Sequence, residues 1–140
     1  MNYLVKGLNH ITFSVSDLDV SLTFYQQVFD ATLLLRAEGM AYLDLRGLWI
    51  ALNVQEDISR REIRQSYTHL AFTVNAEDME QMEDRLRQLH VPIRPGRPRS
   101  AGEAHSLYFT DPDGYLLEVH SGDLAARLAA YKEALTSSRG

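Results

Sequence analysis

The chain has 140 residues, of which 45% are hydrophobic and 24% are charged, and its formal net charge at pH 7 is -5. This composition predicts one compact soluble domain over residues 1–140 and argues against a disordered chain and against non-specific nucleic-acid binding. The sequence shows no secretory signal and no apolar run near the roughly 20 residues of a membrane span, so we expect a cytoplasmic protein without a membrane partner. Because cysteine is absent, any bound metal would be held by nitrogen and oxygen.

The first half of the chain is predicted to contain a strand, a helix and three further strands. Alternating polar and apolar residues predict the strand at 8–15, and Ser16 is a candidate N-cap for the helix. Extended segments follow at about 33–36, 41–45 and 49–53, with a turn at Arg46 and Gly47. The helix is expected to bury a stripe formed by Leu18, Leu22, Tyr25 and Val28 or Phe29.

The second half repeats this order. The run NHITFSV at 9–15 and the run THLAFTV at 68–74 are near copies, and each leads into a helix signal, the second one capped by Asn75. Strands are expected at 91–94, 106–110 and 115–120, with the turn DPDG at 111–114. The loops 56–66 and 96–104 are long enough to be binding loops. A last helix at 123–135 is expected to pack through Leu124, Leu128 and Tyr131. The sequence therefore predicts an α+β fold of two βαβββ modules, about 6–55 and 66–121, followed by that helix.

The duplication places His10 and His69 at equivalent strand positions. Glu118 lies in a third strand between apolar residues, where a carboxylate costs several kcal/mol unless it is paired or bound to a cation. Two histidines and one carboxylate form a set that holds a divalent metal and leaves coordination positions open. A salt bridge from Glu118 to a buried arginine is the alternative. His120, on the same strand face, is a rival third ligand.

For the other histidines and for most cationic residues, a structural or solvent-exposed role is the simpler interpretation. A lone histidine is more often structural than a ligand, which suits His90 and His105. All cationic residues except Lys6 and Lys132 are arginine, and arginine grips oxyanions with two parallel hydrogen bonds. For most arginines a solvated charge remains the simpler interpretation. The residues that favour an anion site are Arg94, Arg97, Arg99 and Arg127, with hydroxyl donors from Thr12, Tyr42, Tyr67 and Tyr108.

The runs LNHITFSVSDL, AYLDLRGLWIAL, QSYTHLAFTV and SLYFTDPDGYLLEVHSGDLAARLAAYKE resemble the fosfomycin-resistance metallothiol transferases of the vicinal oxygen chelate superfamily. The likeness covers about Lys6 to Glu133. The stretches ISRREIRQSYTHLAF and GRPRSAGEAHS are most similar to the bacillithiol-using branch. The lysine and the short Asn/Ser/Gly potassium loop of the glutathione-using branch are absent. In the epoxide hydrolase branch a glutamate acts as base near position 40, where this chain has Met40, with Glu38 two places away.

The resemblance implies a metal-dependent transferase that opens the epoxide of fosfomycin with a small-molecule thiol, bacillithiol or L-cysteine, and so gives antibiotic resistance. It implies that His10, His69 and Glu118 bind Mn(II) or Mg(II), with Zn(II) as a further, inhibitory candidate. It also implies a homodimer in which mixed sheets complete barrel-like cavities. The catalytic residues would be Glu118, Thr12 and Tyr42, and the substrate-binding residues would be Tyr67, Tyr108, Arg97, Arg127, Trp49, Asn53 and Ser106.

Several alternatives stay open on the sequence. Within the resemblance, the chain could be a fosfomycin epoxide hydrolase or a glutathione transferase. Outside it, the same three metal ligands would suit an Fe(II) extradiol dioxygenase, although such enzymes need a further acid/base histidine and an apolar ring pocket. A non-catalytic antibiotic-binding protein of the same fold is the last alternative, and it leaves the burial of Glu118 without a reason.

Overall fold

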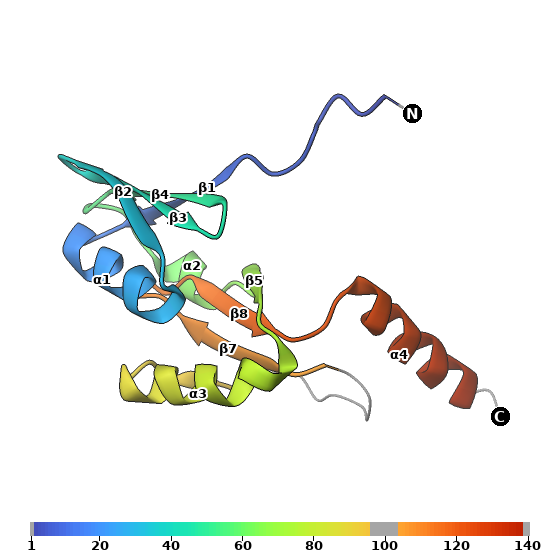
Figure 1. Cartoon of the computed structure of the whole chain (residues 1–140). Helices are drawn as coiled ribbons and strands as arrows, with labels where there is room; N and C mark the ends of the chain where they lie inside the picture. The colour runs from blue at the N-terminus through green and yellow to red at the C-terminus, as the bar shows by residue number, and fades with distance from the viewer. Residues whose placement is uncertain (1, 96–103, 139–140) are drawn as a thin grey trace. The chain divides into compact units, whose positions relative to one another are not determined.

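The protein's structure, a computed structural model, describes residues 2–95 and 104–138. It comprises two compact units, residues 1–60 and 61–140, and each holds one four-stranded sheet (Figure 1). In the part of the chain that is described, no helix is both long and apolar enough to cross a membrane.

The first unit contains one sheet and one helix. Its sheet has the order β1-β4-β3-β2, with β1 parallel to β4 and the other neighbours antiparallel. Helix α1 lies against β3 and β4, and the core includes the fully buried Tyr25, Leu43 and Ile50. The elements are β1 (His10–Val15), α1 (Leu18–Phe29), β2 (Thr32–Ala37), β3 (Met40–Leu45) and β4 (Leu48–Val54).

Local signals explain the ends of these elements, with one correction. The N-cap of α1 is Asp17 and not Ser16, because the Asp17 side chain accepts a hydrogen bond of 3.1 Å from the Val20 amide. The hairpin between β3 and β4 turns at Arg46 and Gly47, which have φ values of 49° and 92°. This turn was predicted, and positive φ at both positions is typical of type I′, one of the two turn types that two-residue hairpins favour.

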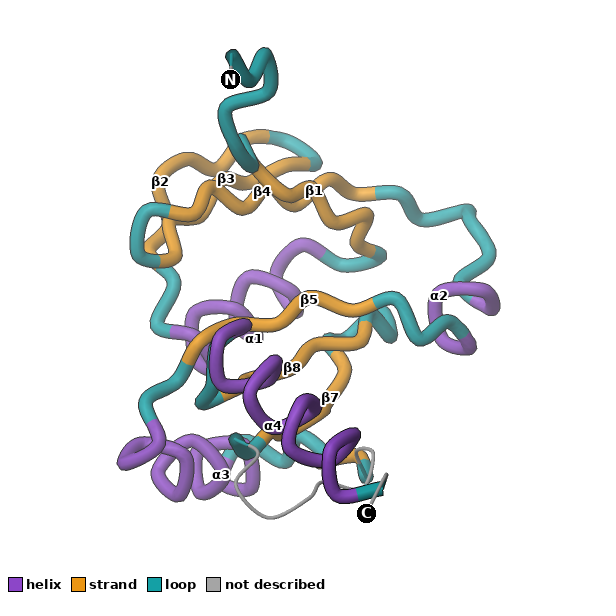
Figure 2. Tube along the Cα trace, turned by 90° about the vertical axis from the view of Figure 1, so that its right-hand side faces the viewer, coloured by secondary structure: helices purple, strands orange, loops and turns teal. Residues whose placement is uncertain are grey.

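The second unit repeats the topology of the first. Its sheet has the order β5-β8-β7-β6, and its first and last strands, β5 and β8, are again parallel. Figure 2 shows the strands of each unit in orange. The elements are α2 (Arg61–Gln65), β5 (His69–Thr73), the 3-10 turn η1 (Ala76–Asp78), α3 (Met79–Gln88), β6 (Ile93–Arg94), β7 (Ser106–Thr110), β8 (Leu116–His120) and α4 (Leu124–Ser137).

The predicted turn at 111–114 joins β7 to β8 and is tightly held. Asp111 is buried, and its Oδ1 accepts hydrogen bonds from the amides of Asp113 and Tyr115, at 2.9 and 3.0 Å. Gly114 has a φ of 97°, a conformation that suits glycine. The turn thereby sets the register between β7, which precedes it, and β8, which follows it. In this register Tyr108 lies opposite Glu118.

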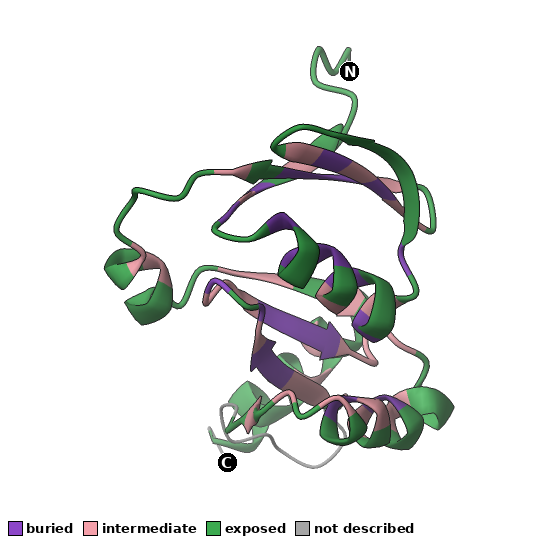
Figure 3. Cartoon of the chain, turned by 90° about the vertical axis from the view of Figure 1, so that its left-hand side faces the viewer, coloured by how far each residue is buried: buried purple, intermediate pink, exposed green. Residues whose placement is uncertain are grey.

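Three expectations for the second unit were wrong. The predicted loop 56–66 contains the short helix α2. The Asn75 side chain makes no capping hydrogen bond. Helix α4 is present, but it contains no buried residue and extends away from the sheet (Figure 1). Its apolar residues Leu124, Leu128 and Tyr131 are exposed instead of packed, because no other described element of the unit covers that stripe. Buried residues lie on β1, β3, β4, β7, β8 and α1, whereas α2 has none (Figure 3).

Candidate active site

His69 and Glu118 meet on the two parallel strands β5 and β8. The register pairs Ala71 with Glu118, and the Nε2 of His69 lies 3.1 Å from the Oε1 of Glu118. Glu118 is only 4% exposed, so its charge requires a partner. Within one unit, the structure therefore brings together two of the three predicted metal ligands.

The other ring nitrogen of His69 shows which atom is available for a cation. Nδ1 lies 2.8 Å from the backbone oxygen of Tyr67. A carbonyl oxygen only accepts hydrogen bonds, so Nδ1 carries the hydrogen, and a neutral ring presents a lone pair at Nε2. Nε2 and the Glu118 carboxylate are then two electron-rich groups at close range, which a proton or a metal ion between them would stabilise.

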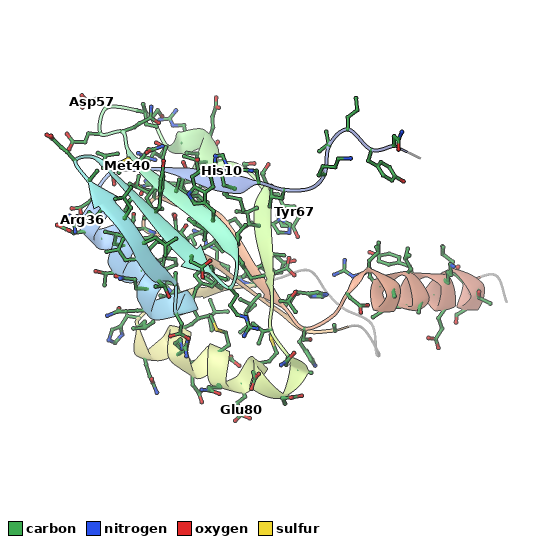
Figure 4. All side chains as sticks on the ribbon, turned by 45° about the horizontal axis from the view of Figure 1, so that its top comes forward. His10, Arg36, Met40, Asp57, Tyr67 and Glu80 are labelled. Carbon is green, nitrogen blue, oxygen red and sulfur yellow. The ribbon has the colours of Figure 1, made fainter. Side chains whose placement is uncertain are left out.

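His10, in the first unit, has the same arrangement. It is exposed at the start of β1 (Figure 4), and its Nδ1 lies 2.6 Å from the Oδ1 of Asn9, also an acceptor. Its ring stacks on Trp49 with centroids 4.3 Å apart. A histidine that is oriented through Nδ1 and leaves Nε2 free is typical of metal ligands.

The remaining predicted residues of the first unit lie on the strands around His10. Thr12 follows two positions later and is exposed, like His10. Tyr42 packs edge-on against Trp49, with centroids 5.0 Å apart, and pairs with Ala51, which also pairs with Thr12. Asn53 is exposed near the end of β4. Thr12, Trp49 and Asn53 are thus open to a ligand.

No group of three histidine, aspartate or glutamate side chains stands together as a metal site among residues 2–95 and 104–138. His10 belongs to the first unit, and His69 and Glu118 belong to the second. The donor set nevertheless fits a divalent cation, because both histidines present Nε2 and the carboxylate is buried beside one of them.

Two tyrosines adjoin the His69 and Glu118 pair. The hydroxyls of Tyr67 and Tyr108 lie 3.5 Å apart, and the Tyr67 ring lies 4.8 Å from that of His69. Tyr67 is exposed, just before β5 (Figure 4), whereas Tyr108 is buried. Burial, the hydrogen bond with Tyr67 and the charge of Glu118 raise the pKa of Tyr108. The raised pKa makes loss of the Tyr108 proton less favourable than in an ordinary tyrosine.

A cavity of about 440 Å³ opens beside these tyrosines in the second unit. Arg64 and Arg94 supply two guanidinium groups to its wall, so the cavity suits an anion. Arg94 was among the residues predicted from the sequence to favour an anion site, whereas Arg64 was not, because its helix α2 was predicted as loop. The residues that line the cavity are Arg64, Gln65, Ser66, Tyr67, Arg94, Pro95, Tyr108 and Leu116.

Ser106, predicted to bind substrate, contacts Glu118 and His120 in this structure. Its hydroxyl donates a short hydrogen bond to the Oε2 of Glu118, and it lies 2.7 Å from the Nδ1 of His120. His120 therefore faces Ser106 and the Oε2 edge of the carboxylate, while His69 faces Oε1. This link was not predicted from the sequence.

Of the two arginines predicted to bind substrate, Arg127 is described and Arg97 is not. Arg127 lies on α4, which extends away from the sheet (Figure 1). Arg97 falls outside the described residues. Their roles remain predictions.

Comparison with known proteins decides the family. Residues 7–119 match the glyoxalase/bleomycin resistance protein/dioxygenase superfamily. A metallothiol transferase FosB from Lysinibacillus sphaericus is 50% identical over 129 residues, which cover 92% of both chains. The chain belongs to the metallothiol transferase family of this superfamily.

Further relatives agree with this assignment. A metallothiol transferase FosB from Bacillus licheniformis is 48% identical over 94% of this chain and 85% of the relative. The fosfomycin resistance protein FosX from Listeria monocytogenes, solved as a mutant with Mn(II) and 1S,2S-dihydroxypropylphosphonic acid, superposes with a TM-score of 0.82. It is 33% identical and covers 91% of this chain and 99% of its own. The metallothiol transferase fold of two βαβββ modules, predicted from the sequence, is thereby confirmed.

Proposed function

We propose that this metallothiol transferase opens the epoxide ring of fosfomycin by adding a small-molecule thiol, bacillithiol or L-cysteine. The single observation that carries the proposal is the pair formed by His69 and Glu118, with Nε2 3.1 Å from Oε1 and Nδ1 engaged by a backbone oxygen. The relatives named metallothiol transferase, at up to 50% identity, support the reaction type.

A divalent metal, Mn(II) or Mg(II), would be held by His10, His69 and Glu118. When bound, it would supply Lewis acidity that stabilises negative charge on the oxygen of the opening ring. The FosX neighbour that contains Mn(II) supports a divalent cation for this fold. We further propose that sheets from two chains of a homodimer complete each barrel-like cavity around such a site.

The phosphonate of fosfomycin would be bound by hydrogen-bond donors that lie near this site. The hydroxyls of Tyr67 and Tyr108, which lie 3.5 Å apart, would donate hydrogen bonds to the phosphonate oxygens. Arg97 and Arg127 would also pair with the phosphonate oxygens, and this part of the proposal rests on the family resemblance and not on a contact at the site. Thr12, Tyr42, Trp49 and Asn53 would line the side of the pocket next to His10.

The reaction itself forms one bond and breaks one. The thiolate sulfur attacks an epoxide carbon, the carbon–oxygen bond breaks, and the electron pair passes to oxygen, which then takes up a proton. Thr12 and Tyr42 carry hydroxyls that would orient the reactants. The reaction would take place in the cytoplasm, where low-molecular-weight thiols are kept reduced.

Hydrolysis of the same epoxide is the second candidate, favoured by the similarity to FosX proteins. Against it, Met40 stands where a base would be expected, and Glu38 is exposed in the turn between β2 and β3.

One incubation separates these activities. Pure protein, fosfomycin and Mn(II) are combined in parallel with bacillithiol, L-cysteine, glutathione or no thiol, and products are identified by mass spectrometry, with EDTA as the control. We expect a thiol adduct with bacillithiol or L-cysteine that EDTA abolishes. A diol formed at the same rate without thiol would indicate a hydrolase, and no product under any condition would contradict both functions.

A further inference from the structure

We propose that His120 is a positioning residue of the metal site, which acts through the Ser106 hydroxyl to hold the Glu118 carboxylate in the orientation that presents Oε1 to the metal. The proposal rests on the metal site of the proposed function, but its test measures metal binding directly. The three residues come from one hairpin, in which Ser106 pairs with His120 across β7 and β8.

The hydrogen-bond directions follow from the chemistry of serine. The Ser106 hydroxyl has one hydrogen, which it donates to Oε2 of Glu118. Towards His120 it can therefore only accept, so Nδ1 of His120, 2.7 Å away, must carry a hydrogen. One hydroxyl thus links an imidazole donor to a carboxylate acceptor.

The two oxygens of Glu118 have different partners as a result. Oε2 is held by Ser106, and His120 Nδ1 lies 3.5 Å from it. Oε1 lies 3.1 Å from His69 Nε2. Because Oε2 is engaged, rotation of the carboxylate is restricted and Oε1 stays on the His69 side. Such outer contacts are known to tune metal affinity about tenfold to a hundredfold.

Gly122 confines the imidazole from its other side. A Cβ at this position would lie 2.9 Å from His120 Nε2 and 2.5 Å from the Cβ of Ala104. Only glycine therefore leaves room for the ring in its present place. With Nδ1 facing Ser106 and Nε2 facing Gly122, His120 does not present a free nitrogen towards His69, which argues against the alternative that it is the third metal ligand.

A pair of substitutions of nearly equal shape isolates the hydrogen bond. In His120→Asn the side-chain amide keeps an N–H donor at the same number of bonds from Cα as Nδ1 of histidine. In His120→Leu the side chain has nearly the shape of asparagine but carries no donor. Mn(II) dissociation constants are measured by electron paramagnetic resonance of the free ion. We expect His120→Leu to weaken Mn(II) binding about three- to tenfold, His120→Asn to stay within about twofold of wild type, and Ser106→Ala to weaken it about tenfold or more.

Controls separate this role from folding and from direct ligation. The matched pair His105→Leu and His105→Asn, at an exposed position, should leave Mn(II) affinity unchanged, and thermal melting checks each variant. Equal loss in His120→Leu and His120→Asn would show that the ring only fills space and would overturn the proposal. So would a loss beyond about a thousandfold in His120→Leu, which would make His120 a ligand.

A second measurement is made on the wild-type protein. At pH 8, the nitrogen chemical shifts of the His120 ring in metal-free protein should report hydrogen on Nδ1, the less common form of neutral histidine, with assignment by comparison with His120→Asn. Hydrogen on Nε2 and none on Nδ1 would overturn the proposal. Neither readout depends on turnover, so failure of thiol addition by the wild-type protein would be distinguished from failure of this inference.

Discussion

The Nε2 atom of His69 lies 3.1 Å from the Oε1 atom of Glu118, and both residues stand on neighbouring parallel strands of one sheet. Since the Nδ1 of His69 is bonded to the Tyr67 carbonyl, the atoms that face each other are both electron-rich in the neutral histidine. A cation between these two atoms would therefore stabilise the pair. Both side chains are needed to bind it.

Glu118→Gln should abolish turnover of fosfomycin and weaken Mn(II) binding, because the amide keeps the size of the side chain but loses its charge. Activity is followed by mass detection of the thiol adduct and binding by calorimetry. Glu80→Gln, at an exposed position of α3, is the matched control and should behave as wild type. Retained activity of Glu118→Gln with Mn(II) would remove Glu118 from the metal site.

Arg127→Lys should raise the KM for fosfomycin several-fold with little change in metal affinity. The guanidinium group offers two parallel hydrogen bonds to a phosphonate, and an ammonium group offers one at a time. Arg87→Lys, on the surface pair with Glu83, is the control. Unchanged kinetics in Arg127→Lys would show that the helix α4 does not bring Arg127 to the substrate.

Tyr108→Phe should reduce the loss of stability at alkaline pH. The folded protein raises the pKa of Tyr108 above its ordinary value of 10.0, so above about pH 10 the unfolded chain releases this proton before the folded chain does. Stability contributed by Tyr108 is complete below pH 10 and falls as the pH rises further. Melting temperatures of EDTA-treated protein from pH 8 to 11 should decline more steeply for wild type than for Tyr108→Phe. Parallel curves would contradict the raised pKa.

Asp111→Ala should destabilise the protein by about 1–3 kcal/mol, because two backbone amides of a buried turn lose their acceptor. Urea unfolding measures this change in free energy. Asp78→Ala, whose side chain makes no capping hydrogen bond, is the control and should have a much smaller effect. An equal effect of both substitutions would show that the Asp111 carboxylate does not stabilise the turn.

Periodicity and internal duplication were sufficient to predict the sheets and the positions of His10 and His69. The duplicated pattern places both at the start of a strand that pairs in parallel with the last strand of its module. The need of the Glu118 carboxylate for a charged partner could also be inferred, because its sequence neighbours are apolar and predict that it is buried.

The link from Ser106 to His120 was missed, although the turn at 111–114 carries the signal. The hairpin that this turn closes pairs Thr110 with Leu116. Counting residues outwards from that pair places Ser106 opposite His120. Helix α2 was missed because it has five residues and no buried face. The packing of α4 was wrong because an apolar stripe predicts burial but does not name its partner.

The most direct test of the metal site is a crystal structure of the protein soaked with Mn(II), with the metal located by its anomalous scattering. We expect one manganese peak bonded to Nε2 of His69, Oε1 of Glu118 and Nε2 of a His10, supplied by the same chain or by its partner. A manganese peak elsewhere, with these three side chains pointing to different places, would contradict the proposed site.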